Sequence, residues 1–157
     1  MAAQQIARTA LCQELDEDLN VLPGMIISAQ APSILWGTIG AGVSVCIWNS
    51  IDRIGGMNHF LLPATNDQAK TYAKFGNVAM YGLSSMLVQQ STIPVFEASI
   101  VGAAFSDEFE EENCKQLITV AEKFLWHENI PVVFQEIGGS KVRQVAFDVE
   151  TGRVAIR

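Results

Sequence analysis

Between residues 25 and 62 the chain alternates short apolar runs with turn residues. The runs cover residues 25–30, 34–39, 43–48 and 54–62. They are rich in Val and Ile and are bounded by Pro, Gly and Asn, which is typical of β-strands. The turn residues Asn49, Ser50 and Asp52 predict that 43–62 forms a hairpin.

Two later segments repeat apolar residues at spacings of three and four. The apolar positions are Phe75, Ala79, Met80, Leu83, Met86 and Leu87 in 72–90, and Leu117, Val120, Ala121, Phe124 and Leu125 in 106–127. One apolar stripe of this period predicts an amphipathic helix in each segment. Gly76 and Gly82 weaken the first helix or allow close packing against a sheet.

The start of the second helix is predicted at Ser106, where acidic residues follow. They are Asp107, Glu108, Glu110, Glu111 and Glu112. Carboxylates at a helix N-terminus are favourable because they meet the positive end of the helix dipole. An acidic binding patch is the alternative, and His127 is expected as a solvated residue at the end of this helix.

Four further strands are expected in the second half of the chain, at 95–102, 132–135, 142–149 and 154–156. A tight turn at 150–153 joins the last two. The predicted class is α+β, with a mixed β-sheet or sandwich core flanked by two main helices. We expect one domain over 1–157, in which 1–24 is either a surface helix or a mobile arm.

No charged residue occurs between Asp18 and Asp52, a stretch long enough to cross a bilayer at about 20 residues. Pro23, Pro32 and several glycines interrupt it, so buried strands explain it better than a membrane helix. The N-terminus has no apolar core of the kind found in secretory signals, and a cytoplasmic location is expected.

Composition narrows the classes of partner. Hydrophobic residues make up 49% of the chain and charged residues 17%, below the roughly 25% charged that is usual, so some apolar surface is available for a partner. The formal net charge of −7 argues against nucleic acid and against an anionic membrane surface. Homo-oligomer formation is left open.

Cysteines and histidines are few and widely spaced. The cysteines are Cys12, Cys46 and Cys114, and the histidines are His59 and His127. Since none of these residues has metal-ligand spacing from another, neither a metal site nor a cofactor is expected.

Two neighbouring segments resemble the core of the CheD family. Residues 40–47 read GAGVSVCI and residues 55–63 read GGMNHFLLP. The family's usual form is Gly-Ser-Cys-Val-x-Val-Cys followed by Gly-Gly-Met-x-His-x-x-Leu-Pro. Further similarity at Glu97-Ala98, at Gly138-Gly139 with Arg143, and at 150–153 extends the resemblance over 25–157.

The resemblance implies the fold of chemoreceptor glutamine deamidases, which convert receptor glutamines to glutamates with a cysteine nucleophile, a histidine base and a threonine. His59 matches the histidine, but Gly42 stands at the cysteine position and Trp36 at the threonine position, with Thr38 displaced by two residues. Gly102-Ala103-Ala104 replaces the family's Gly-Gly-Ala turn.

By the same resemblance, ligand contacts are expected at residues near these motifs. They are Asn58, Gly102, Ala103, Phe105, Asn113, Gly138, Gly139 and Arg143.

Two residues are weighed as replacements for the missing nucleophile. Strand alternation places Ser44 and Cys46 on the same face as Gly42. At about 3.3 Å per residue, Cys46 lies about 13 Å from the nucleophile position and is interpreted as a buried structural residue. Ser44 is nearer, but an alcohol with one unassisted histidine is a poor nucleophile. His59 is either a base or an inherited residue bonded to backbone.

Three functional hypotheses follow. The first is a CheD-like pseudoenzyme that binds chemoreceptor helices or a CheC-like phosphatase partner without deamidating. The second is an active glutamine deamidase that uses another nucleophile, or in which Gly42 is an engineered change. The third is a scaffold repurposed for a small molecule or another protein.

Overall fold

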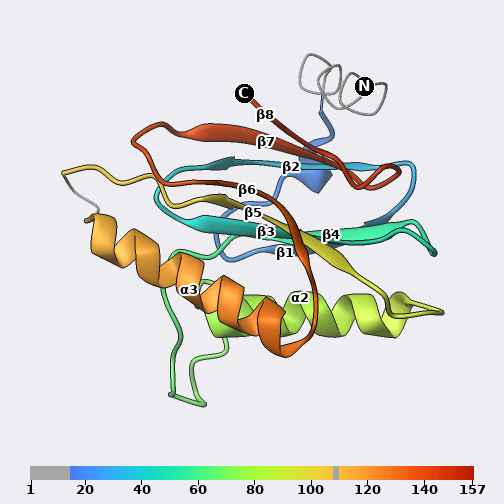
Figure 1. The fold of residues 1–157 in the computed structure, drawn as a ribbon, viewed down its shortest axis with the longest axis horizontal. Coiled ribbons are helices and arrows are strands. Elements are labelled where there is room, and N and C mark those ends of the chain that lie inside the picture. The colour runs from blue at the N-terminus through green and yellow to red at the C-terminus, as the bar shows by residue number, and fades with distance from the viewer. Residues whose placement is uncertain (1–14, 108–109) are drawn as a thin grey trace.

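The computed structural model describes residues 15–107 and 110–157. Two helices lie on one face of a five-stranded sheet, and a three-stranded sheet covers the other face (Figure 1). The elements are η1 (Glu17–Leu19), β1 (Ile26–Gln30), β2 (Ile34–Ile39), β3 (Val43–Asn49), β4 (Ile54–Asn58), α2 (Gly76–Gln90), β5 (Glu97–Gly102), α3 (Glu111–His127), β6 (Val132–Ile137), β7 (Arg143–Asp148) and β8 (Val154–Ile156). The predicted α+β class, with a sandwich core and two main helices, is confirmed.

The larger sheet has the order β1-β4-β3-β5-β6 and the smaller one β2-β7-β8. Neighbouring strands are antiparallel except β5 and β6, which are parallel. The predicted hairpin is formed by β3 and β4, with Cys46 opposite Met57. Its second strand ends at Asn58, earlier than expected, although an isolated bridge joins Val43 to Phe60.

Strand alternation divides the apolar residues between two cores. From β3, Val43, Val45 and Ile47 pack beneath the helices, whereas Cys46 and Trp48 face the smaller sheet. This is the alternation expected from the sequence, and it places Gly42 at the end of the face that looks toward the smaller sheet.

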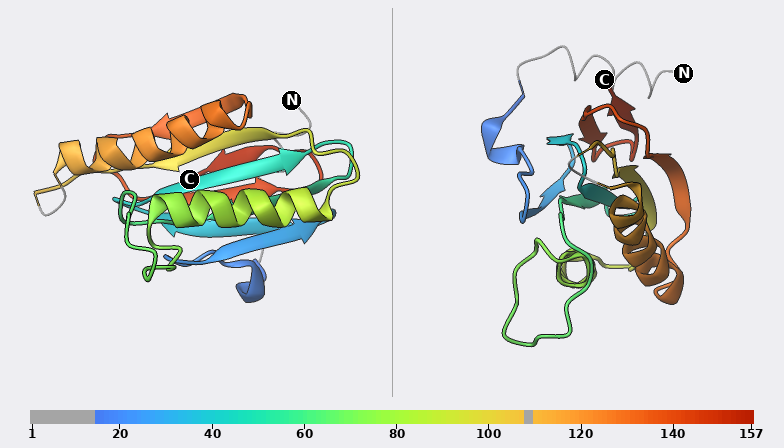
Figure 2. Two further views of the ribbon diagram at one scale, coloured as in Figure 1. Left: turned by 90° about the horizontal axis from the view of Figure 1, so that it is seen from below. Right: turned by 90° about the vertical axis from the view of Figure 1, so that its left-hand side faces the viewer.

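Both helices begin later than the sequence suggested. Helix α2 begins at Gly76, after the predicted position 72, and a Cβ at Gly76 would meet Val120 Cγ1 at 2.7 Å and Phe60 Cε2 at 2.9 Å. The absent side chain therefore lets α2, α3 and the sheet approach closely, and the helices lie side by side across the sheet (Figure 2). Of the two readings of the glycines, close packing applies here.

The prediction that α3 begins at Ser106 was wrong. The helix begins at Glu111, and its N-cap Glu110 makes no side-chain capping hydrogen bond. Glu111 and Glu112 occupy the first turn and His127 the last, as the dipole argument expects.

The N-terminal segment is partly described. Residues 1–14, including Cys12, lie outside the described residues, as do 108–109. Val21 is buried between the sheets, where its amide donates to Trp36 O at 2.7 Å, so 20–24 packs against the sandwich. The uncharged stretch before Asp52 forms β1, β2 and β3. Within the described part of the chain, no helix is long and apolar enough to span a membrane.

Candidate active site

Gly42 and His59 meet where β3 begins and the chain leaves β4. Val43 and Phe60 exchange two backbone hydrogen bonds of 2.9 Å, which places their neighbours Gly42 and His59 on the same face. A Cβ built on Gly42 would lie 3.1 Å from His59 Nε2. The position that the resemblance assigns to the nucleophile is therefore directly beside the imidazole.

A cavity of about 660 Å³ opens at this point, within the range of roughly 300–1,000 Å³ usual for ligand sites. It is lined by Pro23, Thr38, Gly40, Ala41, Gly42, His59, Leu61, Leu62, Pro63, Asn113, Cys114, Gln116 and Leu117. The lining comes from the segment before β1, the end of β2, the loop that joins β2 to β3, the segment after β4 and the first turns of α3. Of the ligand contacts expected from the sequence, Asn113 lies in this lining.

The tryptophan at the threonine position of the resemblance lies elsewhere. Trp36 is absent from the cavity lining, and its Nε1 donates to Asp16 O at 2.8 Å. Thr38, two residues further along β2, lines the cavity. Thr38 is therefore the hydroxyl-bearing residue that shares the cavity lining with Gly42 and His59, and Trp36 is not part of that lining.

The buried state of His59 sets its charge. The side chain is 3% exposed, and Nδ1 lies 3.4 Å from the carbonyl oxygen of Val21. Burial lowers the pKa of His59, although the hydrogen bond to Val21 raises it in part. The imidazole is therefore neutral at neutral pH.

Neither replacement nucleophile weighed from the sequence reaches the cavity. Ser44 is fully buried and is not among the residues that line the cavity. Burial raises the pKa of Cys46 to about 12, which leaves a protonated thiol in the core between the sheets.

The structure instead brings a different cysteine into the lining. Cys114 is 3% exposed on α3, and its Sγ donates to Ala104 O at 3.6 Å. Burial raises the pKa of this thiol, and the nearby Glu111 carboxylate raises it further. The sequence analysis did not assign Pro23, Leu61, Leu62, Gln116 or Leu117 to a site. Leu61 and Leu62 lie in the motif at 55–63 and Leu117 in the apolar stripe of the second helix, but neither pattern indicates which residues line a cavity.

Several residues expected to contact a ligand support the cavity wall from behind. The Ala103 amide donates to Gly42 O at 2.8 Å, and a Cβ at Gly102 would collide with the same oxygen. Arg143 donates to Gly102 O at 3.1 Å and to Gly138 O at 2.7 Å. These residues hold the start of β3 in place and do not line the cavity.

The remaining expected contacts are also structural. The Phe105 amide donates to Gly139 O at 2.9 Å. Asn58 is fully buried on the helix side of the sheet, where its Oδ1 accepts from Val45 N at 2.9 Å and its Nδ2 donates to Met80 Sδ at 3.4 Å. Both ends of Asn58 are thus used inside the core, away from the cavity.

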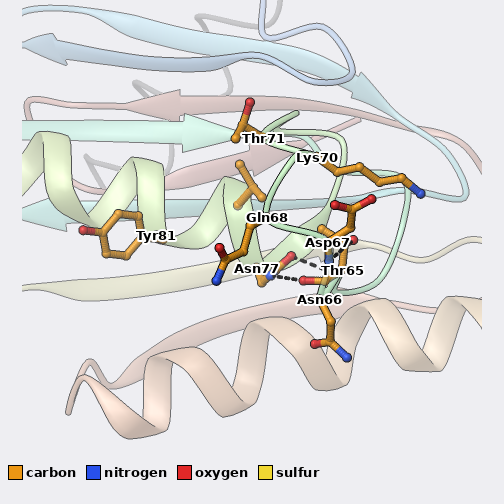
Figure 3. A pocket seen from close by; sticks show the side chains of 9 residues that line it. Thr65, Asn66, Asp67, Gln68, Lys70, Thr71, Asn77 and Tyr81 are labelled. Carbon is orange, nitrogen blue, oxygen red and sulfur yellow. Dashed lines mark hydrogen bonds between the residues drawn. The ribbon is translucent and has the colours of Figure 1, made fainter.

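A second concavity, of about 470 Å³, lies over the loop that connects β4 to α2. Figure 3 shows its polar lining, with Asn77 of α2 hydrogen-bonded to Thr65. Asp67 and Lys70 contribute opposite charges, and Tyr81 lies at its border. It contains neither His nor Cys, and no group of three or more His, Cys, Asp or Glu that could hold a metal occurs in 15–107 or 110–157.

Comparison with known proteins identifies the class. Residues 61–157 match the sequence model of the CheD family, described as CheD chemotactic sensory transduction. The chain therefore belongs to the CheD family of chemotaxis proteins. The matched span begins after Gly42 and His59, so it does not test these two positions.

Individual relatives agree with this family. The chain is 28% identical to "Probable chemoreceptor glutamine deamidase CheD" of Sulfurimonas denitrificans, over 82% of this chain and 86% of the relative. It is 31% identical to "Probable chemoreceptor glutamine deamidase CheD 1" of Anaeromyxobacter dehalogenans, over 85% of this chain and 80% of the relative. A third relative, from Albidiferax ferrireducens and also named CheD 1, is 31% identical over 88% of this chain and 60% of its own length.

Proposed function

We propose that this chain binds the glutamine-bearing cytoplasmic helices of chemoreceptors without deamidating them. Family membership and the names of the relatives support a chemoreceptor as the partner. The observation that supports the loss of deamidation is that Gly42 has no side chain. A Cβ at this position would lie 3.1 Å from Nε2 of His59, where the resemblance expects the nucleophile. Such a protein acts in the cytoplasm, where those receptor helices lie.

The missing atom matters because of the order of events in thiol-dependent deamidation. A thiolate adds to the carboxamide carbon, a protonated base gives its proton to the departing ammonia, and water then hydrolyses the thioester to the acid. His59 is placed for the proton transfers, but Gly42 supplies no atom for the addition. We therefore expect this protein to bind the amide without hydrolysing it.

An active deamidase that uses Cys114 is the second candidate, because this thiol lines the same cavity as His59. Its raised pKa and its hydrogen bond to Ala104 O both favour the protonated form, which is a weak nucleophile. We therefore expect Cys114→Ser to leave ammonia release at the background level of the wild-type protein. A loss of measurable wild-type release in this variant would favour the second candidate.

The test of the proposed function combines a binding assay with an ammonia assay on cytoplasmic receptor fragments. The wild-type chain is expected to bind the fragments and release no ammonia. Gly42→Cys adds a thiol beside Nε2 and is expected to release ammonia, whereas Gly42→Ala adds the same Cβ without sulfur and is the matched control. Ammonia release by the wild-type chain, or failure to bind any fragment, contradicts the proposal.

A separate surface suits a protein partner such as a CheC-like phosphatase. Strand β6 is an edge strand of the larger sheet, and its Val133 and Phe134 are 56% and 40% exposed. Trp126, at the end of α3, is 77% exposed and shares a shallow groove with Val132. Exposed apolar side chains beside an unpaired strand edge are typical of interaction surfaces. Phe134→Lys is expected to abolish binding of the partner, and unchanged binding would exclude this surface.

A further inference from the structure

Among the described residues that line the cavity beside Gly42, none carries a fixed charge. None of its lining residues is Asp, Glu, Lys or Arg, and the polar ones, besides His59, are Thr38, Asn113, Cys114 and Gln116. The acidic residues Glu111 and Glu112 precede Asn113 in the first turn of α3. The ammonium of Lys115, on the same helix, lies 3.5 Å from the Glu111 carboxylate. A ligand group entering the cavity therefore meets dipoles and apolar surface, with no cation in the lining.

The hydrogen bond of His59 fixes what its other nitrogen can do. A carbonyl oxygen only accepts, so the contact of Nδ1 with Val21 O assigns the proton of the neutral ring to Nδ1. Nε2 then carries a lone pair and lies beside Gly42, in the lining of the cavity that the two residues share. In this form Nε2 accepts a hydrogen bond and donates none.

We propose that the cavity distinguishes glutamine from glutamate on the receptor, accepting the neutral carboxamide and rejecting the carboxylate. This inference rests on the proposed function, since it names the chemical state of the side chain that the site binds. The carboxamide NH₂ donates to Nε2 of His59, and its oxygen accepts from the Thr38 hydroxyl or from the Asn113 or Gln116 amide.

A carboxylate is disfavoured for two reasons. It has no hydrogen to donate, so its oxygens oppose the lone pair of Nε2. It also loses its hydration on entering a cavity that offers no cation in return, and burial of an unpaired charge is costly. A protein without a nucleophile at residue 42 would then bind receptors that are still amidated and release those that have become acidic.

One feature of the site acts in the opposite direction. The N-terminus of α3 carries a positive partial charge of about half an elementary charge, which attracts anions. However, the carboxylates of Glu111 and Glu112 lie in that same turn, and the ammonium of Lys115 pairs with only one of them. The local field therefore does not reverse the preference for the neutral amide.

The test measures binding of the full chain to helical receptor peptides that differ at one position. That position carries glutamine, glutamate or glutamate γ-methyl ester. We expect glutamine to bind at least about tenfold more tightly than glutamate, which corresponds to about 1.4 kcal/mol. The ester is neutral but lacks the N–H donor, so it is expected to fall between the two. Glutamate binding as tightly as glutamine overturns this inference and leaves the proposed function intact, whereas no binding of any peptide overturns the proposed function itself.

A charge variant checks that the preference arises in this cavity. Thr38 is an exposed lining residue at the end of β2, so Thr38→Lys adds a cation with little risk to the fold. The variant is expected to raise the relative affinity for the glutamate peptide at least about tenfold. Gln30→Lys, at an exposed position of β1 outside the cavity, is the control and should leave the ratio unchanged. An unchanged ratio in Thr38→Lys, with its melting temperature preserved, contradicts the assignment.

Discussion

At the residue scale, the backbone and side chains around Gly42 pack so closely that little room is left for a side chain at this position. A Cβ there would lie 2.6 Å from Leu61 Cδ2 and 2.8 Å from the carbonyl oxygen of Phe60. Leu61 is 40% exposed and can turn away, but the Phe60 carbonyl is held in a backbone hydrogen bond to Val43. The glycine is therefore built into this strand pair, and a larger residue must displace its neighbours.

The first prediction concerns the stability of Gly42→Ala. Overpacking of this kind typically costs about 1–3 kcal/mol, and we expect a loss of that size in the free energy of unfolding. Urea denaturation of the variant and the wild-type chain measures it. The double variant with Leu61→Ala should recover only part of the loss, because the contact with Phe60 O remains. A neutral or stabilising Gly42→Ala would show that the strand pair is not closed around the glycine.

The second prediction is a pH dependence that arises from His59. Burial lowers its pKa from the ordinary value of 6.5, so the unfolded chain takes up a proton at a higher pH than the folded one. The stability contributed by the neutral imidazole is therefore complete above about 6.5 and falls as the pH drops below that value toward the folded pKa.

Chemical unfolding of the wild-type chain and of His59→Gln between pH 7.5 and about pH 5.5 tests this effect. The variant should lose less stability over this interval than the wild-type chain. His127→Gln, at the exposed end of α3, is the matched control and should behave as the wild-type chain does. Equal slopes for the wild-type chain and His59→Gln would show that His59 is not held neutral by burial.

At the element scale, Trp36 and Thr38 lie two positions apart on β2 and have different surroundings. Trp36 attaches η1 through its indole hydrogen bond to Asp16 O, whereas Thr38 lines the cavity. We predict that Trp36→Phe loses about 1 kcal/mol of stability and keeps receptor binding. Thr38→Val is expected to keep its stability and weaken binding several-fold. If Trp36→Phe weakens receptor binding and Thr38→Val does not, the binding site lies nearer η1 than the cavity.

The same scale shows where sequence patterns were sufficient. The bounds of β2 and β8 follow the apolar runs directly, because each run is bounded by glycine or by a turn. The start of α3 does not, since Ser106 offers a good capping side chain but the helix begins only at Glu111. The position of that helix is fixed by the packing of Cys114 and Leu117 in the core, which cannot be predicted from the local capping residues.

At the scale of the whole molecule, the site depends on contacts between distant segments. The neighbourhood of Gly42 and His59 was predictable, because one hairpin joins them and their motif resembles a known one. The contribution of Asn113, Cys114 and Gln116 was not predictable. It depends on where α3, which is distant in sequence from Gly42 and His59, packs on the larger sheet. The resemblance assigns a hydroxyl to residue 36, whereas Thr38 lines the cavity; the two residues share a face of β2, so the position along the strand, and not the face, makes the difference.

The most direct measurement is the intact mass of a chemoreceptor fragment after prolonged incubation with the purified wild-type chain under conditions in which binding is saturated. If the chain binds without hydrolysis, the mass of the fragment stays that of the all-glutamine form, and the complex is recovered unchanged. A shift to the mass of the corresponding acid, dependent on His59, would show that another atom attacks the amide in place of the side chain that Gly42 lacks.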